Sequence, residues 1–240
     1  MNKASLHSLL LSVAVLIIST VGGALIAQKL AKGDAGISFL WFSCPIVSII
    51  FFSQFLTFPN ARKRLLFQLL YLGFFGFSMT WFMLSLSLPI FWIKEISAGR
   101  KVILALIFLA IMIINLNLGW RIFNKKWNEI SGALSKSEAD IVRTGDDWNK
   151  KIQNMKITHN IYVPGIPEKW TFAFSIALIA FMILGLNLIT AYPTFSVFAW
   201  GISAAVMASY FIQVSGSYFA QAVQVLIIEK DFKYKIKSTS

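Results

Sequence analysis

The chain has 240 residues and little of the chemistry on which most enzymes depend. It contains one cysteine, Cys44, and two isolated histidines, His7 and His159. A single cysteine excludes an intrachain disulfide, and these three residues cannot supply a metal site of ordinary composition. Walker A, dinucleotide-binding and zinc-binding motifs are also absent. The sequence therefore predicts no catalytic residue, no cofactor and no metal, and a membrane-embedded enzyme ranks third among the functions considered.

Charge is scarce as well, at 13% of residues, and it is missing from five long stretches. The mean hydropathy of +0.70 and the 57% of hydrophobic residues lie far above soluble-domain usage. Runs near or above ~20 apolar residues can cross a bilayer, and in lipid the backbone must satisfy its own hydrogen bonds, which predicts helices. The stretches without Asp, Glu, Lys or Arg are Ala4–Gln28, Ala35–Ala61, Leu65–Ile93, Val102–Trp120 and Trp170–Ile228.

These runs predict an all-α integral membrane protein with about six transmembrane helices and one helical cytoplasmic loop. We expect a membrane block of four helices over 1–120, a polar loop over 121–169, and a block of two helices with a basic amphipathic tail over 170–240. The first span is expected to be an uncleaved anchor rather than a signal peptide. Pro89 favours a long third helix that breaks into an interfacial segment. The expected spans are Leu6–Ile26, Ile37–Phe58, Leu65–Ile93, Val102–Trp120, Trp170–Thr190 and Phe195–Val214.

The distribution of basic residues predicts the orientation. Six spans place both termini, the Arg62–Arg64 loop and the 121–169 loop on one side, which then holds 17 of the 22 Lys and Arg residues. The positive-inside rule assigns that side to the cytoplasm of a bacterial inner membrane. The same spread over loops explains the net charge of +12 without a nucleic-acid partner. Beyond Val214 the chain is expected to leave the membrane as a helix or to lie along its surface.

The polar loop carries apolar residues at helical spacing. One set continues from the fourth span, and a second set follows Thr144 and Asp147, which are spaced as a capping box. Two short helices that fold onto each other or onto the membrane surface are one interpretation, and a docking face for a cytoplasmic partner is the other. The residues of this face are Phe123, Trp127, Ile130, Leu134, Trp148, Ile152 and Met155.

The last span carries a stripe of small and polar residues at every fourth position. Such a stripe permits close helix approach, and its glutamines can hydrogen-bond across the contact. It is interpreted as a packing seam within the chain, a seam between protomers, or the lining of a pore. Interhelical hydrogen bonds are also expected for Asn115, Asn117 and Asn187. The stripe residues are Gly201, Ala205, Ser209, Gln213, Ser217 and Gln221.

Together these features predict a non-enzymatic interaction or assembly subunit of a larger membrane system, of the secretion, conjugation, exclusion or defence type. The expected partners are the lipid bilayer, a membrane protein or further copies of the chain, and a possible cytoplasmic protein at 121–169. The alternative is a homo-oligomeric pore or channel.

Overall fold

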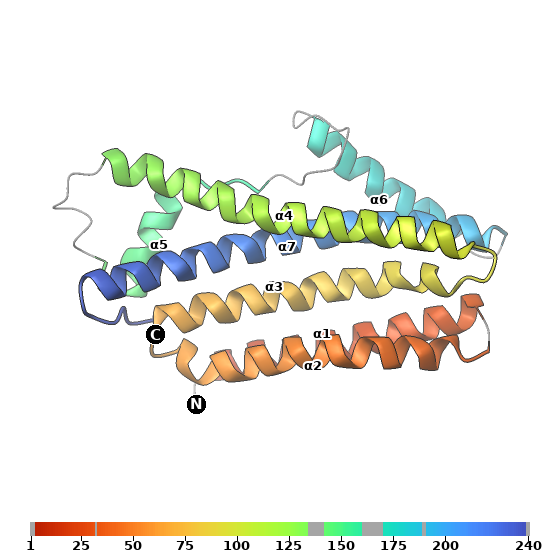
Figure 1. The fold of residues 1–240 in the computed structure, drawn as a ribbon, viewed down its shortest axis with the longest axis horizontal. Coiled ribbons are helices and arrows are strands. Elements are labelled where there is room, and N and C mark those ends of the chain that lie inside the picture. Colours follow the sequence, from red (N-terminus) through yellow and green to blue (C-terminus); the bar gives the residue numbers. More distant parts are fainter. Residues whose placement is uncertain (1–2, 32, 134–141, 160–169, 189–190, 239–240) are drawn as a thin grey trace.

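The protein is all-α in the computed structural model, which describes residues 3–31, 33–133, 142–159, 170–188 and 191–238. Five of its helices are long and apolar enough to cross a membrane. Figure 1 shows them as a bundle of roughly parallel rods with both chain termini at the same end. This end is called the polar end below, because the Arg62–Arg64 turn and α5 lie there as well. The all-α membrane class expected from the sequence is confirmed.

The first half of the chain forms two layers of the bundle. Helices α1 (Lys3–Ala31) and α2 (Ala35–Ala61) pair as a hairpin, and both pack on α3 (Leu65–Ser87). A 3-10 segment, η1 (Leu88–Trp92), follows α3 directly, so the break expected at Pro89 is confirmed. Helix α4 (Ala98–Ala133) then runs without interruption past the apolar part of the fourth span into the polar loop, as its spacing predicted.

Helix α7 (Pro193–Asp231) is the centre of the fold. It packs extensively on both α3 and α4, and α6 (Thr171–Asn187) also lies against it. The helix continues through Val214 to Asp231 without a break, and Ser215, Ala220 and Val225 beyond that point are buried in the bundle. The segment after Val214 therefore continues as a helix inside the bundle rather than along a membrane surface.

The fifth expected span, Trp170–Thr190, differs from the other five. Its helix, α6, has 17 residues and would be about 26 Å long at 1.5 Å per residue, somewhat short of a ~30 Å hydrocarbon core. The expected span continued to Thr190, whereas α6 ends at Asn187 and Leu188 already lies in a turn, where its carbonyl accepts a bond from the Tyr192 N–H. Five spans rather than six thus meet the length criterion among the described residues.

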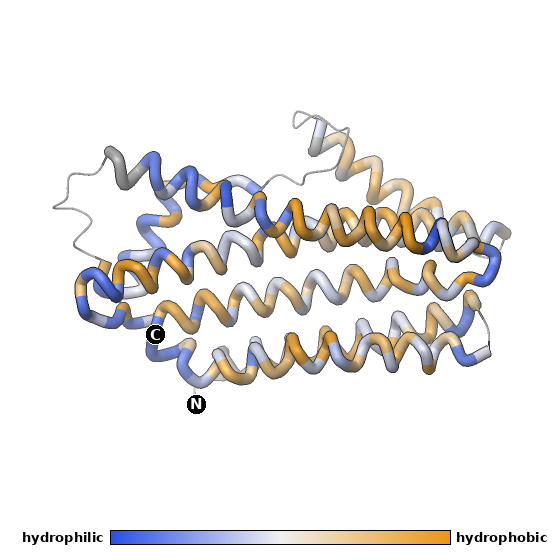
Figure 2. Tube along the Cα trace, in the orientation of Figure 1, coloured by the Kyte–Doolittle hydropathy of each residue, from blue (hydrophilic) through white to orange (hydrophobic). Residues whose placement is uncertain are grey.

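Hydropathy along the bundle separates its ends from its middle. Figure 2 shows apolar residues along the middle of the rods and hydrophilic residues gathered at the polar end, over α5, the part of α4 that follows its apolar run and the last turns of α7. Large apolar side chains such as Trp41, Ile49 and Leu56 of α2 point outward and are exposed. This surface is typical of helices that contact lipid tails.

Candidate functional site

Three segments that are far apart in the sequence meet at the polar end and form a folded cap on the bundle. The residues before α3, the residues around α5 and the chain after α7 are joined by backbone hydrogen bonds. We call the described residues 142–157 and 232–238 the cap. Its backbone bonds are Leu65 N to Ile236 O (3.0 Å), Gly145 N to Lys237 O (2.8 Å), Lys237 N to Arg143 O (3.3 Å) and Ser238 N to Lys63 O (3.4 Å).

Helix α5 (Gly145–Asn154) begins where the sequence predicted. The Thr144 hydroxyl accepts a bond from the Asp147 N–H (3.3 Å), and the Asp147 carboxylate accepts one from the Thr144 N–H (3.0 Å), so the capping box is confirmed. The side-chain hydrogen bond from Thr144 is the largest cause that lowers the pKa of Asp147 below its ordinary value. A carboxylate near a helix N-terminus is also favoured by the helix dipole. The start of α5 is therefore well defined by local chemistry alone.

Thr144→Ala is expected to fray the first turn of α5 and to cost roughly 1 kcal/mol of local stability, because the Asp147 N–H loses its acceptor. Hydrogen exchange at residues 146–149 is the measurement, with Thr158→Ala, an exposed residue beyond α5, as the control. Lowering the pH should also destabilise the first turn of α5. Since the folded pKa of Asp147 is depressed, its contribution is complete above the unfolded pKa and is lost as pH falls through the folded pKa. Equal exchange in both variants at neutral pH would contradict the capping role.

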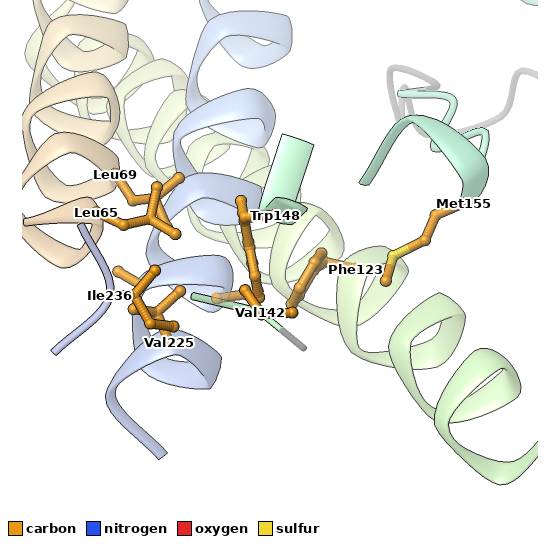
Figure 3. Close-up of a cluster of buried hydrophobic side chains, with 10 residues drawn as sticks. Leu65, Leu69, Phe123, Val142, Trp148, Met155, Val225 and Ile236 are labelled. Carbon is orange, nitrogen blue, oxygen red and sulfur yellow. The ribbon is translucent and has the colours of Figure 1, made fainter. Parts of the chain in front are cut away.

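The interior of the cap is an apolar cluster centred on Trp148. Figure 3 shows the Trp148 ring between Phe123 of α4 and the side chains of α3 and α7. Trp148, Phe123 and Ile236 are all fully buried. The Trp148 indole N–H also donates to Gln221 Oε1 of α7 at 3.2 Å, which satisfies the one polar atom of the ring. The buried members of this cluster are Leu65, Leu69, Phe123, Val142, Trp148, Met155, Ala220, Ala222, Val225 and Ile236.

A buried carboxylate ties the cap to the bundle. Glu229 near the end of α7 is 8% exposed, and its Oε2 lies 2.5 Å from the Arg64 guanidinium. Its Oε1 accepts a hydrogen bond from the Ile236 N–H at 2.9 Å. Both oxygens are therefore paired, which is the condition under which a buried charge is tolerated. Arg64, predicted only as a topology signal, also fixes the chain after α7.

The predicted docking face is largely enclosed by these contacts. Phe123, Trp148 and Met155 are buried in the cluster, and Trp127 and Ile152 pack against it as partly buried residues. Trp127 also carries the Lys151 ammonium 4.8 Å above its ring. The backbone of Ile130 lies in α4, and Leu134 falls outside the described residues. Surfaces for a partner are therefore to be sought on the outer side of the cap.

The stripe on α7 faces inward along its whole length. All six residues are buried, and the contacts that bury them come from the same chain. Gln213 donates to Asn115 Oδ1 of α4 at 3.4 Å, and Gln221 accepts from Trp148. The interhelical bond expected for Asn115 is thus present. Asn117 and Asn187 have exposed side chains and instead donate to carbonyls four residues earlier in their own helices.

Close backbone crossings surround the stripe, and sequence reasoning found only some of them. A Cβ added to Gly119 of α4 would fall on the carbonyl oxygen of Gln213, and one added to Gly216 of α7 on the carbonyl oxygen of Leu116. At Gly73 and Gly76 of α3 an added Cβ would instead meet side chains of α7, the Phe219 ring and the Ser215 hydroxyl. The sequence marked Gly73 and Gly76 for close packing but not the pair Gly119 and Gly216, which lie off the four-residue stripe.

A buried polar network between α1, α2 and α3 was also missed. Ser12 donates to Gln54 Oε1 at 2.7 Å, and Gln54 Nε2 donates to Ser78 Oγ at 2.6 Å and to the Phe74 carbonyl at 2.9 Å. All three polar side chains are fully buried. Their positions in separate apolar runs gave no periodic signal. Each of the three side chains is bonded to the other two, which is how buried polar groups between helices are stabilised in lipid.

Groups of three or more His, Cys, Asp or Glu residues that could hold a metal ion are not found in the part of the chain that the structure describes. Cys44 is exposed on the outside of α2, where lipid tails would meet it. Comparisons of this chain with protein-family models, with curated proteins and with solved structures found no match.

Proposed function

We propose that the protein is a non-enzymatic interaction or assembly subunit of a larger membrane system, of the secretion, conjugation, exclusion or defence type. The observation that supports this proposal is the cap. Its short helix and terminal segment are held on the bundle by backbone bonds, an ion pair and a buried aromatic cluster. A surface held in this way has one orientation relative to the membrane, which is what an adaptor or assembly contact requires.

The outer side of the cap has the character of a protein-binding or membrane-facing surface of positive charge. Lys150 of α5 and Lys233, Lys235 and Lys237 after α7 are exposed, beside the exposed Arg143. A partner with an acidic surface would be steered toward this end, and the attraction would weaken with salt. The two glutamines of the stripe, Gln213 and Gln221, bond Asn115 and Trp148 of the same chain, so the homo-oligomeric pore has less support as a function.

A stoichiometric partner is expected to depend on the charge of the cap. Lys150→Glu and Lys235→Glu should lower its recovery in mild detergent, whereas Lys94→Glu at the opposite end of the bundle should not. Recovery is measured by quantitative mass spectrometry after site-specific photocrosslinking from Asp146. Equal recovery with cap and opposite-end variants would contradict the proposal. A single-channel current from the purified protein that changes with Gln213→Leu would favour the pore instead.

The polar end is proposed to face the cytoplasm of a bacterial inner membrane. With Cys44 replaced by alanine, a cysteine at the exposed position 146 should resist an impermeant thiol reagent in intact cells and react after lysis. A cysteine at Ser97, exposed at the opposite end, should react in intact cells. The reverse pattern would invert the orientation while leaving the bundle unchanged.

A further inference from the structure

A cavity of about 390 Å³ lies between the cap and the bundle. Helices α3, α5 and α7 form its walls, and the chain that follows α5 closes one side. Its size falls within the range of small-molecule sites, which is roughly 300–1,000 Å³. Its lining contains both apolar and polar residues, with the polar ones slightly more numerous. The polar lining residues are Gln68, Asn149, Gln153, Lys156, His159, Ser217, Tyr218 and Gln221.

Two buried polar atoms at this cavity have no hydrogen-bond partner within the described part of the chain. One is Oγ of Ser217, a residue that is 2% exposed, and the other is Nε2 of His159. A buried hydroxyl that is left unpaired costs free energy, so such an atom in a roomy polar cavity indicates a missing partner. The protein groups close by have other bonds: Gln221 Oε1 accepts from Trp148, and Gln68 Oε1 accepts from Ser238.

The charge of the lining residues favours a negatively charged ligand. Among the residues that the structure describes, the cavity is lined by one cation, Lys156, and by no aspartate or glutamate. Because the carbonyl oxygen of Gln221 accepts a bond from the protein, the amide N–H group is the part of this side chain that is turned to a ligand. Hydroxyl, amide and ammonium donors without a competing carboxylate are the groups that bind phosphate or carboxylate oxygens.

The position of the cavity in the bundle favours a ligand that has both a charged and an apolar part. Its α3 residues, Leu65, Gln68, Leu69 and Leu72, lie within about 10 Å of the start of that helix at 1.5 Å per residue. The basic turn Arg62–Arg64 comes immediately before. This is the depth at which lipid headgroups meet the hydrocarbon core, and basic pockets between helices at this depth bind anionic headgroups. Leu69, Leu72 and Val214 supply an apolar wall on the deeper side.

We propose that this cavity binds the phosphate-bearing headgroup of an anionic lipid. Lys156 and the hydroxyl of Ser217 contact the phosphate oxygens, the amide of Gln221 contributes a further donor, and the leucine wall receives the start of the acyl chains. This site goes beyond the proposed role as an assembly subunit, since it holds whether or not a protein partner binds the cap.

The test is a titration of the purified full-length protein by native mass spectrometry. Phosphatidylglycerol is compared with phosphatidylcholine of identical acyl chains, and glycerol 3-phosphate serves as the soluble phosphate. Phosphatidylglycerol is expected to bind at least about tenfold more tightly than phosphatidylcholine, because both lipids carry the phosphate but the choline cation of phosphatidylcholine would be repelled by Lys156. Equal binding of the two lipids would overturn the proposal. If glycerol 3-phosphate bound as tightly as phosphatidylglycerol, the cavity would be a site for soluble phosphate compounds, and the proposal of a lipid ligand would be wrong.

A second experiment distinguishes binding in the cavity from general attraction of the lipid to a basic surface. It changes the charge of two adjacent exposed residues. Gln153 lines the cavity, and Asn154 does not. Gln153→Glu should weaken phosphatidylglycerol binding by about fivefold or more and Gln153→Lys should strengthen it, whereas Asn154→Glu and Asn154→Lys should change it less than about twofold. Ser217→Ala, which removes the unpaired hydroxyl, should weaken binding while leaving the thermal stability of the lipid-free protein unchanged or higher. Equal effects at 153 and 154 would overturn the proposal.

Discussion

Gly119→Ala is expected to destabilise the bundle by about 3 kcal/mol, at the upper end of the cost of overpacking. The added methyl group would fall on the carbonyl oxygen of Gln213 and within 2.8 Å of its carbonyl carbon and 3.0 Å of the Ser217 nitrogen. All three are backbone atoms of α7. Unlike a side chain, they cannot rotate away, so α4 and α7 must move apart. That movement would also break the bond between Gln213 and Asn115.

Thermal unfolding of the purified protein in detergent is the measurement, with Gly99→Ala as the matched control. Gly99 lies at the start of the same helix, and a Cβ there meets nothing within 4 Å in the part of the chain that the structure describes. The control should unfold at the wild-type temperature or slightly above it, because alanine is the better helix former. Gly216→Ala should lower the stability by a similar amount, because it adds a methyl group on the α7 side of the same helix crossing. If Gly119→Ala and Gly99→Ala unfold alike, then α4 and α7 do not cross here.

Trp148→Ala is expected to detach the cap from the bundle at a cost of about 3–5 kcal/mol. The ring is fully buried against Phe123 and Trp127, with centroids 6.5 Å and 5.3 Å away, and it contacts α7 through Gln221. Alanine would leave a cavity where α4, α5 and α7 meet. Because α5 has only 10 residues, it has little helical stability of its own once this contact is lost.

Limited proteolysis at residues 142–156 and hydrogen exchange over 234–237 measure the detachment. Trp148→Phe separates the two contributions of the side chain, since it keeps most of the packing and removes the bond to Gln221. Trp170→Ala, at an exposed tryptophan, should leave the cap protected. A cap that stays protected in Trp148→Ala would mean that its backbone bonds to Lys63 and Leu65 are sufficient alone.

Local chemistry was enough to predict the helices and several of their ends. Apolar length predicted α1 to α4, because in lipid an uncharged run of this size has no alternative that satisfies its backbone. Thr144 and Asp147 predicted the start of α5, and Pro89 predicted the end of α3, since both signals act within a few residues. The α6 span was overestimated because apolar residues of a turn cannot be told from those of a helix by hydropathy.

The contacts between helices were decided only by the tertiary structure. In a soluble protein the apolar face of a helix shows which side is buried, but in lipid the exposed side is equally apolar and the pattern disappears. The pairing of Gly119 with α7 and the network of Ser12, Gln54 and Ser78 therefore left no periodic trace. The contacts of the cap were likewise decided only by the tertiary structure. Its apolar residues were visible in the sequence, but whether Trp148 met a partner protein or Gln221 of its own α7 depended on contacts between residues 73 positions apart.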